Sequence, residues 1–172
     1  MPDTFTKIAT VTVGAGGAAN MVFSSIPQTY TDLCIKVSAR GTNTTGSMYV
    51  SFNAISANYN VTVGYGDGAS AASTNYLAAS ELQFLGANNI SSSGASIFSN
   101  VEIYIPSYTD AVNKAMSVEA VIEDNVASGA TVRQGIHAGF LTNTAAISTV
   151  TLRAAANFAQ YSKATLYGIS KS

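Results

Sequence analysis

Apolar and polar residues alternate one by one along most of this chain of 172 residues. A period of two places successive side chains on opposite faces of a β-strand, and the helical period of about 3.6 is nearly absent. The clearest segment runs from Thr31 to Arg40. In that strand we expect Leu33, Ile35, Val37 and Ala39 to face a core, and Cys34, Lys36, Ser38 and Arg40 to face outward.

The same pattern predicts about ten strands joined by polar turns. Residues 21–26 are expected to return beside residues 4–13 as a hairpin partner. Residues 67–80, rich in Ala and Ser, predict a surface loop or a short helix, and the Ala-rich residues 153–162 predict a helical turn. Besides 31–40, the expected strands cover 4–13, 21–26, 48–54, 58–66, 99–107, 114–124, 131–142, 147–155 and 163–170.

Short strands at spacings of about 8–12 residues are typical of an all-β sandwich or barrel. The long connections favour a jelly roll over a simple meander. We therefore expect an all-β fold, a jelly-roll-type antiparallel β-sandwich of about 8–10 strands. No linker divides the chain, so residues 1–172 are expected to form one domain, with residues 1–9 as an N-terminal contact arm.

Charged residues are scarce. They make up 10% of the chain, whereas hydrophobic residues make up 47%, and an average soluble protein is about 25% charged. A surface short of charge is poorly protected against association, so we expect much of it to be covered by neighbouring subunits. A neutral secreted domain is the alternative reading of this composition.

The charge pattern and the hydropathy exclude two classes of partner. The net charge is −1 and no basic cluster occurs, so nucleic acid is not an expected partner. No apolar run approaches the roughly 20 residues of a membrane span, and the first residues lack the features of a signal peptide. We expect a soluble protein made in the cytoplasm.

Candidate catalytic groups are few. His137 is the one histidine and has no candidate triad partner, so a structural role is expected for it. Cys34 is the one cysteine, which rules out an internal disulfide and favours a packing role. Glu102 and Glu119 remain open as a carboxylate pair, although exposed positions on neighbouring strands explain them more simply. We expect no enzyme, and we assign no catalytic residue, metal or cofactor.

Aromatic residues suggest a contact surface. Nine tyrosines and no tryptophan occur, and Tyr suits both protein interfaces and stacking on sugar rings. Tyr65 and Tyr76 flank a small-residue stretch that contains Asp67. One local carboxylate is too few for a calcium site, so Asp67 is read as part of a glycine-rich turn. We assign Tyr65, Asp67 and Tyr76 to a candidate partner- or glycan-contact loop.

Two stretches resemble a module of tailed-bacteriophage virion proteins, notably those of phages that infect cyanobacteria. The first is "FSSIPQTYTDLCIKVSARG", residues 23–41, and the second is "ISTVTLRAAANFAQYSKATLYGI", residues 147–169. The resemblance implies a jelly-roll β-sandwich, often trimeric, found on fibres and on capsid surfaces. It brings no catalytic residues.

The resemblance leaves the part of the virion open. The chain enters its first expected strand within a few residues of Met1, which favours a free-standing module over the end of a fibre. We expect a capsid decoration or cement protein, a homotrimer that binds the major capsid protein on the exterior of the virion. The alternative is a receptor- or glycan-binding head of a fibre that recognises host surface glycans.

Overall fold

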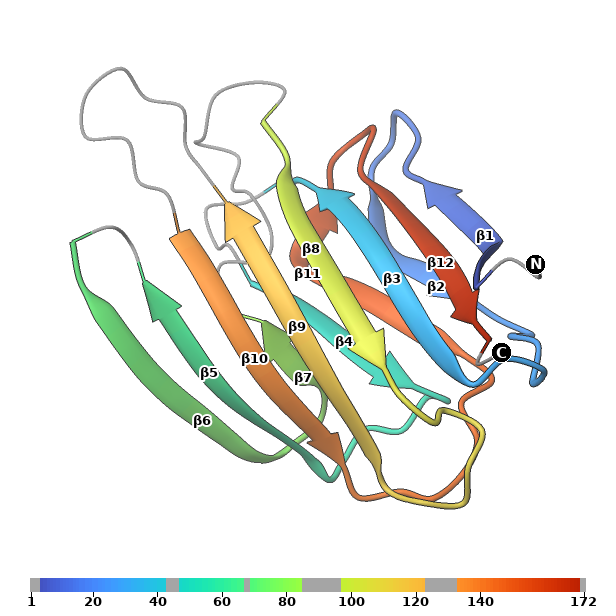
Figure 1. Cartoon of the computed structure of the whole chain (residues 1–172). Coiled ribbons are helices and arrows are strands. Elements are labelled where there is room, and N and C mark those ends of the chain that lie inside the picture. The colour runs from blue at the N-terminus through green and yellow to red at the C-terminus, as the bar shows by residue number, and fades with distance from the viewer. Residues whose placement is uncertain (1–3, 43–46, 67–68, 85–96, 123–132, 171–172) are drawn as a thin grey trace.

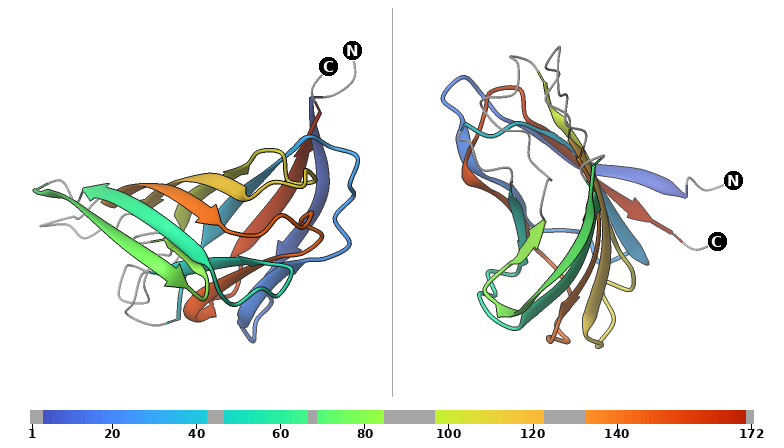
Figure 2. Two further views of the ribbon diagram at one scale, coloured as in Figure 1. Left: turned by 90° about the horizontal axis from the view of Figure 1, so that it is seen from below. Right: turned by 90° about the vertical axis from the view of Figure 1, so that its left-hand side faces the viewer.

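The computed structural model describes residues 4–42, 47–66, 69–84, 97–122 and 133–170, and within these residues all regular structure is β-strand (Figure 1). The strands form two antiparallel sheets, one of eight strands and one of four. Figure 2 shows the smaller sheet covering one face of the larger one. The strands are β1 (Phe5–Thr12), β2 (Ala18–Phe23), β3 (Asp32–Ala39), β4 (Met48–Phe52), β5 (Tyr59–Gly66), β6 (Ala71–Ala79), β7 (Leu82–Phe84), β8 (Ser99–Ile105), β9 (Lys114–Ile122), β10 (Arg133–Leu141), β11 (Val150–Phe158) and β12 (Lys163–Ile169).

Eight of these strands form a jelly roll. Four antiparallel pairs are nested in the sequence: β1 with β12, β2 with β11, β3 with β8, and β4 with β7. Further pairs join β12 to β3 and β11 to β4, which completes two four-stranded sheets. This nesting is a long hairpin rolled up on itself, so the expected jelly-roll sandwich is confirmed.

The other four strands extend one sheet of the roll. Strands β9 and β10 are inserted between β8 and β11, and strands β5 and β6 between β4 and β7. The two insertions pair with each other through β10 and β5, so the larger sheet continues from β8 through β9, β10 and β5 to β6. We call these four strands the sheet extension. Within the described residues they raise the strand number to twelve, above the predicted 8–10.

The core lies between the two sheets, and alternation places side chains in it as predicted. In β3, Leu33, Ile35 and Val37 are buried, whereas Lys36 is exposed. The predicted inward residues of β4, β8 and β9 are buried as well. One fully buried aliphatic side chain contributes about 1.5–3 kcal/mol to folding, so these faces fix which side of each strand is inside.

The two stretches that suggest the phage module lie together in the fold. Their strands β3 and β12 pair from Asp32 with Ile169 to Ser38 with Lys163. The Gln28 side chain donates to the backbone carbonyl of Ile147 at 3.0 Å, which joins one stretch to the other. Gly168 lies so close to the Tyr30 ring that an added Cβ would come within 2.3 Å of it. Both stretches therefore build one structural unit.

Four expectations about local structure are wrong. β2 does not pair with β1, because the roll sends it to the smaller sheet beside β11. Residues 5–9 are not a free contact arm: they belong to β1 and pair with β12, while residues 1–3 lie outside the described residues. Residues 71–79 form strand β6, not a loop or helix, and residues 153–158 continue strand β11.

Candidate interaction surface on the sheet extension

The outer face of the sheet extension carries exposed apolar side chains. The smaller sheet lies on the other side of the larger one, so this face is open within the described residues. Ile136 is 70% exposed, Val121 44% and Phe140 40%. The register arranges the face in four rows across β9, β10 and β5: Ala115, Phe140 and Asn60; Ser117, Ala138 and Thr62; Glu119, Ile136 and Gly64; Val121, Gln134 and Gly66.

Strand alternation places Ile136 and Phe140 on the outer face of β10. Their strand alternates with Gly135, His137 and Gly139 on the inner side. A Cβ on Gly139 would lie 2.7 Å from Met116 Cγ and 3.0 Å from Leu82 Cδ2, so only glycine fits between β9 and β7. Ile136 and Phe140 occupy the outer face, whereas His137 and Leu141 are buried on the inner side. We call the twelve positions of the four rows the extension face.

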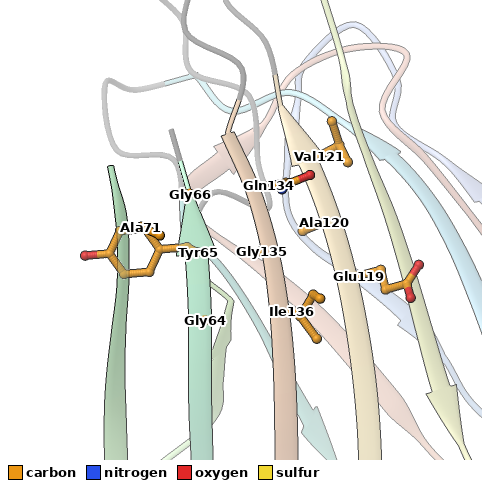
Figure 3. A pocket seen from close by; sticks show the side chains of 10 residues that line it. All are labelled: Gly64, Tyr65, Gly66, Ala71, Glu119, Ala120, Val121, Gln134, Gly135 and Ile136. Atoms are coloured by element: carbon orange, nitrogen blue, oxygen red, sulfur yellow. The ribbon is translucent and has the colours of Figure 1, made fainter. Parts of the chain in front are cut away.

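A shallow depression of about 440 Å³ lies at one end of the extension face. Gly64 and Gly66 face outward and leave the sheet bare there, and Gly135 also lines the depression. Figure 3 shows Ile136 and Glu119 on the neighbouring strands β10 and β9. The Gln134 side chain adds an amide to this lining.

The predicted contact residues do not meet in this depression as side chains. Tyr65 lines it, yet strand alternation puts its side chain on the same face as Val63, and Figure 3 shows it extending toward Ala71, away from Ile136. Tyr76 pairs with Val61, four positions from Tyr65 along β5, a separation of about 13 Å. Asp67 lies outside the described residues.

Three charged residues lie in one row beside the depression. Lys36 on β3 forms an ion pair with Glu102 on β8, and Glu102 is directly opposite Glu119 on β9. The hydrogen bond that Lys36 donates to Glu102 in this ion pair raises the pKa of Lys36. Directly opposed side chains have Cβ atoms about 4.5–5.5 Å apart, so the register brings the two carboxylates that the sequence left open within reach of one another. They lie on an open sheet face, and the absence of enzyme activity stays a prediction.

Cys34 is buried although it is on the outward side of β3. Its register partners are Tyr104 on β8 and Tyr167 on β12. Burial, and next the nearby Glu102 carboxylate, raise the pKa of the Cys34 thiol to about 11. A hydrogen bond from Tyr104 to Asp32 Oδ2 at 2.7 Å raises the pKa of Tyr104. The predicted packing role of Cys34 therefore fits its surroundings.

The contacts of two buried ionisable side chains indicate structural roles for them. His137 is 1% exposed and meets the Phe84 ring edge-on, with the ring centroids 5.5 Å apart. Lys114 is equally buried, and its Nζ donates to the carbonyls of Asp110 and Val112. Burial lowers the pKa of Lys114. The lysine ties the turn after β8 to the start of β9, and nothing in the sequence pattern pointed to it.

The outer face of the smaller sheet holds a second polar group that sequence reasoning missed. Arg153 on β11 lies over the Tyr49 ring, 4.0 Å from its centroid, and donates from Nε to Glu81 at 2.8 Å. The bond to Glu81 raises the pKa of Arg153. Arg153 and Tyr49 are register partners on β11 and β4. A single sequence does not determine how two strands pair, so no sequence pattern indicated that Arg153, Tyr49 and Glu81 would meet.

The described residues contain no group of three or more histidine, cysteine, aspartate or glutamate side chains placed to hold a metal ion. Among the same residues no helix of the length and hydrophobicity needed to cross a membrane is found. Comparison of the chain with protein-family models, curated proteins and solved structures finds no match.

Proposed function

We propose that this chain is a structural protein of a tailed-phage virion, a decoration protein that binds the outer surface of the capsid and stabilises the head. The partner is the major capsid protein. The resemblance of residues 23–41 and 147–169 to phage virion proteins supports the proposal. The extension face is the observation that carries it.

The extension face has the composition of a protein-binding surface. Among its twelve positions one is charged, Glu119, and the exposed apolar side chains lie in the middle of the sheet. The centres of protein interfaces are depleted in charge and enriched in large apolar side chains, whereas isolated exposed apolar residues carry no such meaning. Here the apolar residues are neighbours in register on a rigid sheet, so a partner meets them together.

Stabilisation of the head follows from repetition. Each copy supplies a preformed face and loses little conformational freedom on binding, because backbone hydrogen bonds to β9 and β5 already hold β10. Many weak contacts act together when copies are linked around a capsid. Such a layer resists the outward pressure of the packaged DNA without any chemical step.

The test is co-sedimentation of the purified protein with heads of the phage that encodes it, prepared without their decoration protein. Wild type is expected to pellet with the heads. Ile136→Lys places a charge in the centre of the face, and the new lysine lies opposite Glu119, so the fold is kept. We expect the variant to bind at least about tenfold more weakly, the loss typical of a central interface residue.

Tyr161→Asn is the matched control. Tyr161 is also 70% exposed, but it lies in the turn before β12, and its positive φ of 70° suits asparagine. This variant is expected to pellet like wild type. Equal binding of Ile136→Lys and wild type would mean that the extension face does not contact the capsid, and the proposal would lose its support.

A glycan-binding head is the second candidate, and the depression favours it. Glu119 and Gln134 offer a carboxylate and an amide beside the apolar Ile136, a combination that suits a sugar with one polar edge and one apolar face. A glycan array separates the candidates. Binding to a defined glycan that Glu119→Gln and Gln134→Ala both reduce, without binding to heads, would favour the fibre role.

A further inference from the structure

Strand β6 is an open edge of the larger sheet. Within the described residues β5 is its one neighbour, and Figure 1 shows β6 as the outermost strand on the side away from β1. Its nine residues are all exposed or half-buried. They include no charged residue and no proline. A strand of this kind presents a row of backbone donors and acceptors to any second strand.

Of the other three sheet edges, β1 and β7 carry the usual protection, and the pairing of β2 with β11 shifts register between Arg153 and Phe158. In β1, Lys7 is exposed and the register shifts between Lys7 and Ala9, and the strand also contacts β2. At the far edge of the smaller sheet, β7 is three residues long. Lysines, bulges and short strands are the features by which proteins prevent edge pairing. Strand β6 has none of them between Ala71 and Tyr76, where its pairing with β5 is regular.

We propose that β6 pairs antiparallel with β6 of a second copy of this chain, about a two-fold axis at Thr74. An exposed strand edge pairs with another strand through backbone hydrogen bonds. The side chains of β6 are complementary to those of a second β6 that runs in the opposite direction. Directly opposed residues share a face, so each pair meets on one side of the joined sheet. The pairs are Thr74 with Thr74 of the second copy, Ser73 with Asn75, Ala72 with Tyr76, and Ala71 with Leu77.

This register opposes each large side chain to a small one. Tyr76 and Leu77 both meet alanines, so neither meets another large side chain. Thr74 meets itself, and Thr–Thr is a favourable cross-strand pair. The paired stretch ends at Leu77, because Ala78 has a φ of 51° and leaves the extended conformation. Two eight-stranded sheets would then form one continuous sheet.

The experiment uses opposite charges at the two positions that the register brings together. Ser73→Lys with Asn75→Lys places lysine opposite lysine twice in the dimer, whereas Ser73→Lys with Asn75→Glu places lysine opposite glutamate twice. Both positions are exposed on one face of β6, so each double variant is expected to fold. Ser117→Lys, at an exposed position of β9 whose register partners Ala138 and Tyr104 are uncharged, controls for an added charge away from β6.

Sedimentation velocity across a concentration series reads the result. For wild type we expect the mass to rise from that of one 17.7 kDa chain toward twice this value. The lysine–lysine variant should dissociate at a concentration about tenfold higher than wild type, from the summed effect of two cross-strand pairs. The lysine–glutamate variant should match or exceed wild type, and Ser117→Lys should match it.

Three results would overturn the proposal. They are a monomer at every concentration, equal behaviour of the two double variants, and a trimer that neither double variant weakens. Circular dichroism of each variant excludes unfolding as the cause of any change. Binding to capsids is measured separately through Ile136→Lys, so failure of this dimer leaves the proposed function standing and the converse also holds.

Discussion

Two neighbouring residues of β3 should respond oppositely to an acidic substitution. Ile35 is fully buried in the core between the sheets, whereas the Lys36 side chain is 52% exposed and paired with Glu102. Ile35→Asp is expected to prevent folding, and Lys36→Glu to leave the fold intact. The contrast tests the facing of β3, on which the register of the larger sheet depends.

The magnitudes follow from burial. Removing a buried isoleucine side chain costs about 2–5 kcal/mol, and an unpaired buried carboxylate adds several more, which together match the whole stability of about 5–15 kcal/mol of a typical domain. Lys36→Glu removes a half-exposed ion pair worth about 0–1 kcal/mol and opposes two glutamates at a cost of about 0.2–1 kcal/mol. One kcal/mol corresponds to about 2–4 °C in Tm for a chain of this size.

Far-UV circular dichroism and urea unfolding measure both variants. Lys36→Glu should melt a few degrees below wild type, and adding Glu102→Lys should restore the lost stability by reversing the pair. Ile35→Asp should be insoluble or lack the β-sheet spectrum. Similar stability of the two single variants would refute the facing assigned to β3 and the register built on it.

Two further predictions concern Cys34 and Gly168. The Cys34 thiol is buried, so it should resist a thiol-specific disulfide reagent until the protein unfolds. Its pKa rises from 9.0 to about 11 on folding, so the unfolded chain loses the proton first, and the contribution of this thiol to stability falls as the pH rises from 9 to 11. Cys34→Ala should remove this pH dependence of stability in urea titrations. Fast labelling of the native protein would contradict the burial. Gly168→Ala should cost about 1–3 kcal/mol through overlap with Tyr30, and less in a Tyr30→Ala background, while Gly16→Ala, with open space around it, should be near neutral in the same melts.

Alternation predicted the strands that have one buried face and failed where this condition is absent. β8 and β9 have a core side and a solvent side, so their apolar residues fall on every second position. β6 is largely exposed on both faces, and its Ala and Ser residues carry no period. The pairing of β2 with β11 depends on residues far apart in the chain, which no local pattern records.

Sequence reasoning did not find the extension face, for a related reason. Large apolar residues are normally expected inside, yet Ile136 and Phe140 face outward, and Gly139 between them on the inner side must stay small because it packs against Leu82 of β7. That requirement comes from the closeness of two sheets and is visible only when both are in place. Likewise, Glu102 and Glu119 become neighbours through the register of β8 with β9, and their spacing in the sequence gives no indication of it.

The place of β12 affects how the chain acquires its structure during synthesis. β12 lies between β1 and β3, and the hydrogen bond between the hydroxyls of Thr10 and Thr165 spans 155 residues of sequence. β1 therefore leaves the ribosome long before β12 is synthesised, and until then neither edge of β1 is paired with another strand. Folding of the roll is completed only after β12 has been made, and such a high contact order predicts slow folding, on a timescale of milliseconds to seconds.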